Sequence, residues 1–176
     1  MVSDTPHRIL LEGEDNSYQK DSGIADGVVS PGQLVDVSGT DTSGATTEFT
    51  FARNSTDGAV TVPRIAVELS KTGQTIDDDY ADGDYLEFRT FQQGEEAYIQ
   101  VFDGDNAGAS GTDTSDNANI ATGDYLVAYG GSGEQGTFRA YDSGDGDTEG
   151  LKLFQALEDQ DNSGGTSPAF VRAVKV

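Results

Sequence analysis

Short runs of alternating apolar and polar residues recur along this chain, and turn residues separate them. The stretch Arg64–Phe88 shows the pattern most clearly. Ile65, Val67 and Leu69 alternate with polar residues, an acidic connection follows, and a Gly-Asp turn begins a second alternating run at Leu86. Alternation with a period of two is typical of strands with one buried face. We therefore expect this stretch to form a pair of adjacent strands.

Similar runs predict further strands over residues 34–37, 47–51, 60–62, 97–102, 126–129, 137–141, 151–157 and 170–176. Residues 151–157 also tolerate a short helix, and we favour a strand there. The 23 glycines and the many Ser, Thr and Asp residues suit short strands joined by tight turns. We predict an all-β fold class: a single-domain antiparallel β-barrel or sandwich over residues 29–176, preceded by an extended N-terminal arm over residues 1–28.

One turn-and-strand unit occurs three times. Residues 30–37 (SPGQLVDV), 81–88 (ADGDYLEF) and 121–128 (ATGDYLVA) align without gaps, and the last two share Gly-Asp-Tyr-Leu. The glycine of each unit is expected to supply a positive φ in the turn. We interpret the units as three corners of one scaffold. Strand alternation would point two side chains of each unit inward: Val35 and Val37, Leu86 and Phe88, Leu126 and Ala128.

The charge balance is strongly acidic, with 32 Asp and Glu against 10 Lys and Arg and a formal net charge of −22. Such a surface repels itself in dilute salt, whereas at 1 M salt the Debye length is only about 3 Å. We expect the source to be an extreme halophile or one of its viruses. The charge argues against nucleic acid and membrane as partners, since binding phosphate requires clustered Lys and Arg. With neither a membrane-spanning run nor a signal-peptide pattern in residues 1–16, we expect synthesis in the cytoplasm.

The residue types do not favour catalysis. The single histidine, His7, lies in the polar arm, and the chain has no cysteine, so the usual pairs of nucleophile and base are missing. Paired carboxylates are common in glycoside hydrolases, but a sugar-binding cleft needs aromatic walls and the chain has no tryptophan. We predict that the protein is not an enzyme and that it needs no cofactor.

Three acidic loops raise the question of calcium. Asp145, Asp147 and Glu149 loosely match the first half of a D-x-D-x-[DN]-G loop, but Ala156 stands where the bidentate Glu belongs. Residues 103–108 match less well, and residues 77–79 are a plain aspartate cluster. In a chain this rich in aspartate we interpret all three as solvated surface, and a structural cation between subunits stays open.

Five motifs follow one another along the chain: residues 64–69 (RIAVEL), 73–86 (GQTIDDDYADGDYL), 94–99 (GEEAYI), 120–126 (IATGDYL) and 136–139 (GTFR). In order and spacing they resemble the head decoration, or capsid cement, proteins of tailed viruses. With the acidic composition, the resemblance implies a tailed virus of haloarchaea. It covers most of the chain from about Arg8 onward. Residues 38–63 and 103–118 are longer than the family plan needs, which suggests added features on the outer side of the particle.

The resemblance implies a structural role in the virion. Proteins of this kind are typically trimers on the outside of an icosahedral shell, where they clamp neighbouring major capsid subunits. We therefore expect a homotrimer that binds the major capsid protein on the outer surface of the head and cements the shell. Candidate contacts with an acidic capsid are basic and aromatic residues of the arm and of the first predicted strand of the opening stretch: Arg8, Tyr18, Lys20 and Arg64.

Two other functions stay open at this point. One is a secreted or cell-surface β-rich module of a haloarchaeon that binds glycans or calcium; its marks would be a signal peptide or a sequon-rich stalk. The other is a different virion component, such as a tail-tube or fibre domain. The copy number per virion separates shell decoration from both.

Overall fold

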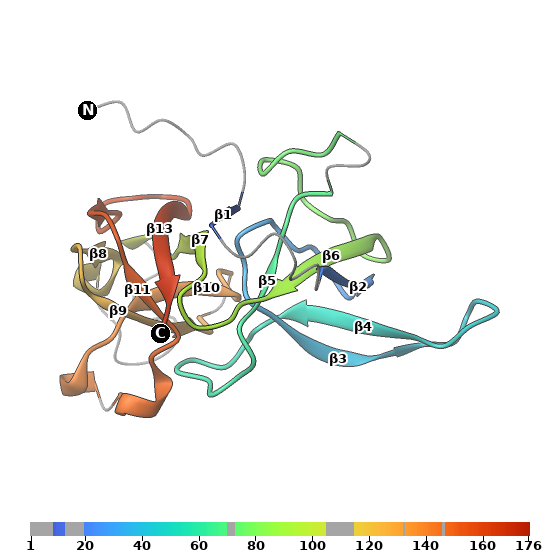
Figure 1. Cartoon of the computed structure of the whole chain (residues 1–176), viewed down its shortest axis with the longest axis horizontal. Coiled ribbons are helices and arrows are strands. Elements are labelled where there is room, and N and C mark those ends of the chain that lie inside the picture. The colour runs from blue at the N-terminus through green and yellow to red at the C-terminus, as the bar shows by residue number, and fades with distance from the viewer. Residues whose placement is uncertain (1–8, 13–19, 70–72, 105–114, 132, 146) are drawn as a thin grey trace.

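The computed structural model describes residues 9–12, 20–69, 73–104, 115–131, 133–145 and 147–176 (Figure 1). Strands and three short 3₁₀ helices make up the regular structure of these residues, which confirms the all-β prediction. The strands are β1 (Leu10–Glu12), β2 (Lys20–Ala25), β3 (Val35–Asp41), β4 (Glu48–Arg53), β5 (Arg64–Ala66), β6 (Tyr85–Thr90), β7 (Glu96–Val101), β8 (Asn119–Ile120), β9 (Tyr125–Tyr129), β10 (Thr137–Ala140), β11 (Phe154–Ala156), β12 (Gln160–Asp161) and β13 (Ala169–Lys175). The 3₁₀ helices are η3 (Ser115–Ala118), η4 (Ser143–Asp145) and η5 (Glu149–Leu151).

Strands β7, β10, β9, β11 and β13 form a closed ring. All neighbours are antiparallel except β7 and β10, and the pairing of β13 with β7 closes the ring. The short strand β1 pairs with the first residues of β7. The larger hydrophobic cluster is built mainly from this barrel. Within it the rings of Phe138 and Phe154 pack edge to face, with 5.5 Å between their centroids. Closure leaves the central strands without a free edge.

The second sheet has the order β3-β4-β2-β6-β5. An isolated bridge between Leu34 and Ile65 brings the start of β3 back beside β5. Leu34 and Ile65 belong to the barrel cluster, while the next residues, Val35 and Ala66, belong to a second, smaller cluster. Successive residues at this seam therefore pack into different cores, which joins the two sheets while each keeps a core of its own.

Backbone hydrogen bonds reinforce the seam. Leu34 N donates to Gly136 O at 2.7 Å, Gly136 N to Asn54 O at 2.8 Å, and Asn54 N to Leu34 O at 2.9 Å, so that three distant segments close a cycle. Gly136 has a φ of 83°, and a Cβ there would lie 2.9 Å from Leu34 O. Only glycine fits both the conformation and the close approach.

The predicted corners share one geometry, and a fourth corner joins them. The third residue of each turn is a glycine with a φ between 85° and 96°. The side chain of the fourth residue accepts the N–H of the first at 2.7–2.9 Å. The glycine N–H donates to a carbonyl of a neighbouring segment at 2.8–2.9 Å. These turns are Ser30–Gln33, Ala81–Asp84, Gln92–Glu95 and Ala121–Asp124.

The structure corrects the arm. Lys20–Ala25 is strand β2, which lies between β4 and β6 in the second sheet, so the prediction of an arm over residues 1–28 is wrong for this part. The strand was missed because it carries little apolar area of its own. A Cβ on its Gly23 would lie 2.4 Å from the ring of Phe51, which covers this strand instead. Residues 1–8 and 13–19 lie outside the described residues.

Candidate functional site

The hairpin of β3 and β4 extends away from the rest of the molecule (Figure 1). Val37 pairs with Phe51, and Phe49 lies two residues from Phe51, so these side chains share one face of the hairpin. Val35 and Phe51 are buried at the base, whereas Val37 and Phe49 are 49% and 61% exposed. The apolar face of the core thus continues into solvent. We call Val37 and Phe49 the hairpin strip.

The hairpin strip corrects one prediction and offers a candidate contact surface. Val37 does not point into a core, because the hairpin projects past the strands that would cover it. Along residues 37–41, β3 pairs with β4 alone in the part of the chain that the structure describes. An exposed strand edge beside exposed apolar side chains is suited to contact with another protein. The neighbouring Glu48 and Asp41 keep the hairpin acidic around these apolar side chains.

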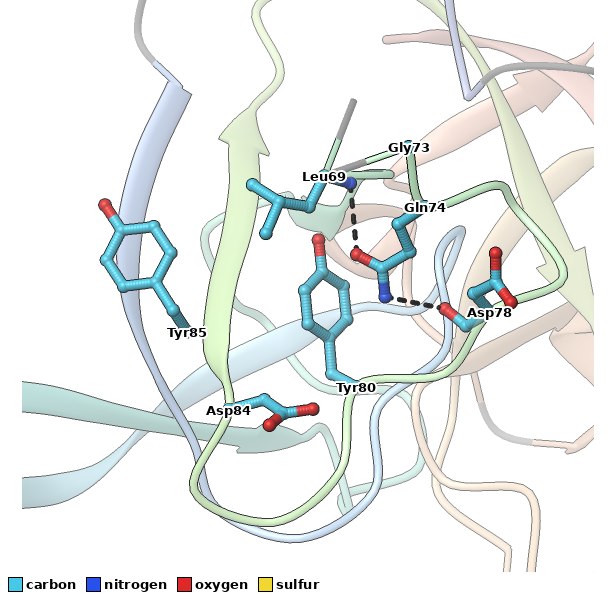
Figure 2. A pocket seen from close by; sticks show the side chains of 7 residues that line it. All are labelled: Leu69, Gly73, Gln74, Asp78, Tyr80, Asp84 and Tyr85. Carbon is cyan, nitrogen blue, oxygen red and sulfur yellow. Dashed lines mark hydrogen bonds between the residues drawn. The ribbon is translucent and has the colours of Figure 1, made fainter. Parts of the chain in front are cut away.

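A second feature is an open hollow of about 440 Å³ along the Arg64–Phe88 stretch (Figure 2). Gln74 braces its wall, since its Oε1 accepts Leu69 N–H at 3.3 Å and its Nε2 donates to Asp78 O at 2.9 Å. The residues lining the hollow are Leu69, Gly73, Gln74, Asp78, Tyr80, Asp84 and Tyr85.

The two tyrosines of the hollow differ in their freedom. Tyr80 is buried, and its hydroxyl donates to Val67 O at 2.5 Å; burial raises the pKa of Tyr80 well above its ordinary value. The Tyr85 side chain is 51% exposed. Hydrogen bonds from the Thr75 N–H and hydroxyl lower the pKa of Asp78, which stays ionised at neutral pH. The exposed Tyr85 ring lies on one side of β6, and Asp78 lies on the other (Figure 2).

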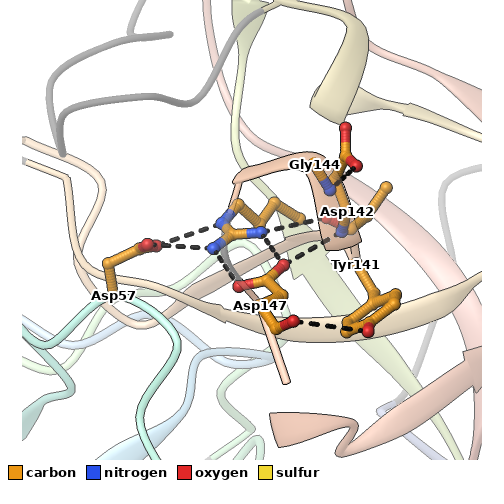
Figure 3. A network of polar contacts seen from close by, with 7 residues as sticks. Asp57, Tyr141, Asp142, Gly144 and Asp147 are labelled. Carbon is orange, nitrogen blue, oxygen red and sulfur yellow. Dashed lines mark hydrogen bonds and ion pairs between the residues drawn. The ribbon is translucent and has the colours of Figure 1, made fainter. Parts of the chain in front are cut away.

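Arg139 on β10 organises a third cluster (Figure 3). Its guanidinium donates to both carboxylate oxygens of Asp57 at 3.1 and 2.9 Å, and to both of Asp147 at 2.6 and 2.9 Å. The side chains of Arg139 and Asp147 are only 2% and 5% exposed, and that of Asp57 is 27% exposed. The cluster ties the loop after β4 and the loop after β10 to the barrel, which is a structural task.

This cluster decides the role of one calcium candidate. Burial would raise the pKa of Asp147, but hydrogen bonds from Arg139 and the Asp142 N–H, together with the guanidinium charge, lower it. With both oxygens bound to Arg139 and a side chain only 5% exposed, Asp147 is not part of the solvated surface. Asp145 ends η4 and Glu149 begins η5. Over the described residues, no group of three or more His, Cys, Asp or Glu side chains is placed to hold a metal ion.

The structure describes only two of the four predicted capsid contacts, Lys20 and Arg64. Arg8 and Tyr18 lie outside the described residues. Lys20 is the first residue of β2, opposite Arg89, and Arg64 is the first residue of β5. Their contact with a capsid stays a prediction. As for membranes, the described residues contain no helix of the length and apolarity that a bilayer span requires.

Comparison with known proteins shows a weak likeness in fold. No family model matches the chain, and no curated protein matches it. Among solved structures, the head fiber gp8.5 N base of bacteriophage phi29 is similar over 89% of this chain and 92% of that chain, with 13% sequence identity and a TM-score of 0.49. An identity and a TM-score this low carry no conclusion about the function of this chain.

Proposed function

We propose that this chain is a non-enzymatic structural protein of a virion, which binds the outer surface of an icosahedral capsid and cements the shell of major capsid proteins. The proposal starts from the order of sequence motifs that resembles head decoration proteins. Three of the recurring motif elements, at residues 81–86, 94–95 and 121–126, fall on corners of the fold. The resemblance therefore concerns the scaffold and not one exchangeable loop.

The observation that carries the binding role is the hairpin strip. An apolar face that runs from the core to an exposed Phe49 on a projecting hairpin disfavours an isolated monomer in water, and contact with a partner removes that cost. In molar salt, charges beyond contact distance are screened within about 3 Å. Apolar contacts then contribute most of the binding free energy, and the basic candidates Lys20 and Arg64 contribute less.

The scaffold suits reinforcement more than catalysis. A closed barrel joined to a second sheet by the Leu34 seam resists deformation, because its strands are tied by backbone hydrogen bonds between segments far apart in the sequence. A trimer would present three hairpins to neighbouring capsomers. Several weak contacts made at once bind far more tightly than one, so modest docking at each hairpin is enough to strengthen a shell.

The first test is the copy number of the chain in purified virions, measured by quantitative mass spectrometry. Shell decoration requires hundreds of copies, comparable with the number of local three-fold positions. A chain that is absent, or present in only a few copies per particle, refutes the proposal and favours a cell-surface module or a tail component.

The second test is cosedimentation with capsids that lack the chain, in molar KCl. Phe49→Ser should weaken binding by about ten-fold or more, since burying a phenylalanine contributes about 1.5–3 kcal/mol. Val60→Ser is the matched control, because Val60 is an exposed apolar residue outside the hairpin. Deleting residues 1–8 tests the arm without touching β1 or β2. Equal binding of wild type and Phe49→Ser would remove the hairpin strip from the proposal.

A further inference from the structure

The carboxylate of Asp36, at the base of the projecting hairpin, is bound by two segments of the chain. Asn54 Nδ2 donates to Asp36 Oδ2 at 2.6 Å, and the Thr61 hydroxyl donates to Asp36 Oδ1. Asn54 comes directly after β4, whereas Thr61 lies in the segment between the hairpin and β5. We call these three residues the Asp36 clamp. Because Thr61 is outside the hairpin, the clamp ties β3 to a neighbouring part of the molecule.

The clamp is anchored in the seam between the two sheets. The backbone of Asn54 donates to Leu34 O at 2.9 Å and accepts from Gly136 N at 2.8 Å. Its side chain also accepts the Thr56 N–H at 3.2 Å, and the residue is only 5% exposed. A buried amide that is bound through both its oxygen and its nitrogen has little freedom to turn. Asn54 therefore holds Asp36 against a fixed point of the scaffold.

The clamp lies where the support of the hairpin ends. On the apolar face of the base, Val35 and Phe51 are buried in the smaller hydrophobic cluster. Beyond the clamp, β3 pairs with β4 alone in the part of the chain that the structure describes, and residues 42–49 are all exposed. The pairing shifts register between Val37 and Gly39, and a β-bulge at such a shift bends the strand. The tie to Thr61 thus comes directly before the point where the hairpin can change direction.

A hairpin that is supported at its base and extends away from the molecule acts as a lever (Figure 1). From Asp36 to Asp41, which pairs with Glu48, β3 is about 17 Å long at about 3.3 Å per residue. A rotation of about 10° at the base would move this end of the hairpin by about 3 Å. Phe49, the neighbour of Glu48, moves with it. Small changes at Asp36 therefore become large changes in the place where the hairpin strip is presented.

We propose that the Asp36 clamp sets the direction in which the hairpin projects, so that Asp36 is a positioning residue for the hairpin strip. A carboxylate bound through both oxygens is fixed in orientation, and hydrogen bonds to a charged acceptor are stronger than neutral ones. These contacts persist in molar salt, which screens charges beyond contact distance. The direction of the hairpin is a property of the isolated chain, and its consequence for docking rests on the proposed function.

The first measurement is a distance within the full chain, free in molar KCl. The chain has no cysteine, so spin labels on Glu48→Cys and Gln93→Cys, both at exposed positions, report the distance between hairpin and scaffold by double electron–electron resonance. When Asp36→Ala is added, we expect the mean distance to shift, or its distribution to widen, by about 3 Å or more. Asp36→Asn keeps one acceptor oxygen and should give a smaller change.

The matched control is Asp41→Ala. Asp41 also accepts two hydrogen bonds, from the Ser43 N–H at 2.7 Å and the Ser43 hydroxyl at 3.0 Å, but both lie within the hairpin. This variant removes as many hydrogen bonds from an aspartate of β3 without releasing its base, so the distance should stay unchanged. Thr61→Val removes only the donor outside the hairpin and should change the distance as Asp36→Ala does. It also replaces Asp36→Ala if circular dichroism shows that this variant does not fold.

The second measurement is cosedimentation of the unlabelled variants with capsids that lack the chain. If the released hairpin spends about one-fifth of its time in the docking direction, Asp36→Ala should bind about five-fold more weakly although Phe49 is intact. Distances unchanged in Asp36→Ala and Thr61→Val, or changed equally in Asp41→Ala, would overturn the clamp. A changed distance with unchanged capsid binding would refute its role in docking. If the wild type does not bind capsids, the proposed function fails, and the distances still decide whether the clamp sets the direction.

Discussion

Replacing Arg139 with methionine is the sharpest test of how this fold is held together. The variant keeps most of the length and apolar volume of the side chain but removes the guanidinium. Asp147, with a side chain only 5% exposed, then loses its charge partner and two hydrogen bonds. Removing one member of a buried ion pair typically costs about 3–5 kcal/mol, because an uncompensated charge stays buried.

The matched control is Arg172→Met. Arg172 also forms an ion pair, in this case with Glu96, and the distance from Arg172 Nη2 to Glu96 Oε2 is 2.6 Å. The Arg172 side chain, however, is 43% exposed. Exposed pairs contribute about 0–1 kcal/mol, and salt weakens them. Each variant thus removes a guanidinium that is bound to a carboxylate, but Arg139 is buried and Arg172 is exposed. In about 1 M KCl we expect the loss at Arg139 to persist and the loss at Arg172 to vanish.

The dependence on pH provides a second signature. In the wild type the pKa of Asp147 is lowered, so its contribution to stability is complete above the unfolded-state pKa of about 4 and is lost as pH falls through the folded-state pKa. In Arg139→Met the hydrogen bonds and the charge of the guanidinium are gone, and only the Asp142 N–H opposes burial, which raises the pKa of Asp147. Protonation of Asp147 then favours the folded state of the variant. The stability gap between variant and wild type should therefore narrow as pH falls toward about 4, where the variant gains stability, and narrow further below about 4, where the wild type loses it.

Urea denaturation, followed by circular dichroism and by tyrosine fluorescence because the chain has no tryptophan, measures these free energies. For a chain of this length, a loss of about 3–5 kcal/mol corresponds to a lowering of Tm by roughly 6–20 °C. Arg139→Met/Asp147→Asn should recover part of the loss, since it removes the buried charge. A cost below about 1 kcal/mol for Arg139→Met, equal to that of Arg172→Met, would refute the reasoning.

Three further predictions concern packing, the projecting hairpin and salt. Gly23→Ala should cost about 1–3 kcal/mol by overpacking, since the new Cβ would lie 2.4 Å from the Phe51 ring. Gly44→Ala should change the stability by no more than about 0.5 kcal/mol, since its new Cβ would lie 3.9 Å from Thr46 O, and thermal melts compare the two variants. Phe49→Ser should leave Tm within about 2 °C of wild type, since this side chain is 61% exposed, and a larger drop in the melt would mean that the hairpin strip is packed within the protein. Lowering KCl from molar to millimolar concentration should lower Tm, because a net charge of −22 is then unscreened; a Tm independent of salt would contradict the halophilic interpretation.

The corners were predictable because their chemistry is local. Each of the four corners spans only four consecutive residues. A glycine at positive φ, followed by an acceptor side chain, closes each turn. The Gln92–Glu95 corner carries the same signal, with Gly94 followed by Glu95, but lacks the Gly-Asp-Tyr-Leu match that drew attention to two of the others. A search for glycine followed by any acceptor side chain would have found it.

The errors arose where distant residues decide the outcome. The strand β2 looks like a polar connection by itself, and it becomes a central strand because Phe51, from β4, packs over its Gly23. Asp147 looks like one more surface aspartate, and it is buried because Arg139 binds it together with Asp57, which lies 82 residues from Arg139 in sequence. The pattern of apolar and polar residues within either segment does not indicate these distant partners.

The sequence by itself determined the all-β class, the corners and the acidic surface, because each follows from residue type and spacing over a few positions. Only the tertiary structure decided which apolar positions are covered. Phe49 and Phe51 lie on one face of the same strand, yet Phe51 is buried and Phe49 is exposed, since the hairpin extends past the sheet that covers its base. Alternation determines the direction of a side chain, and the packing of distant strands determines whether anything lies opposite it.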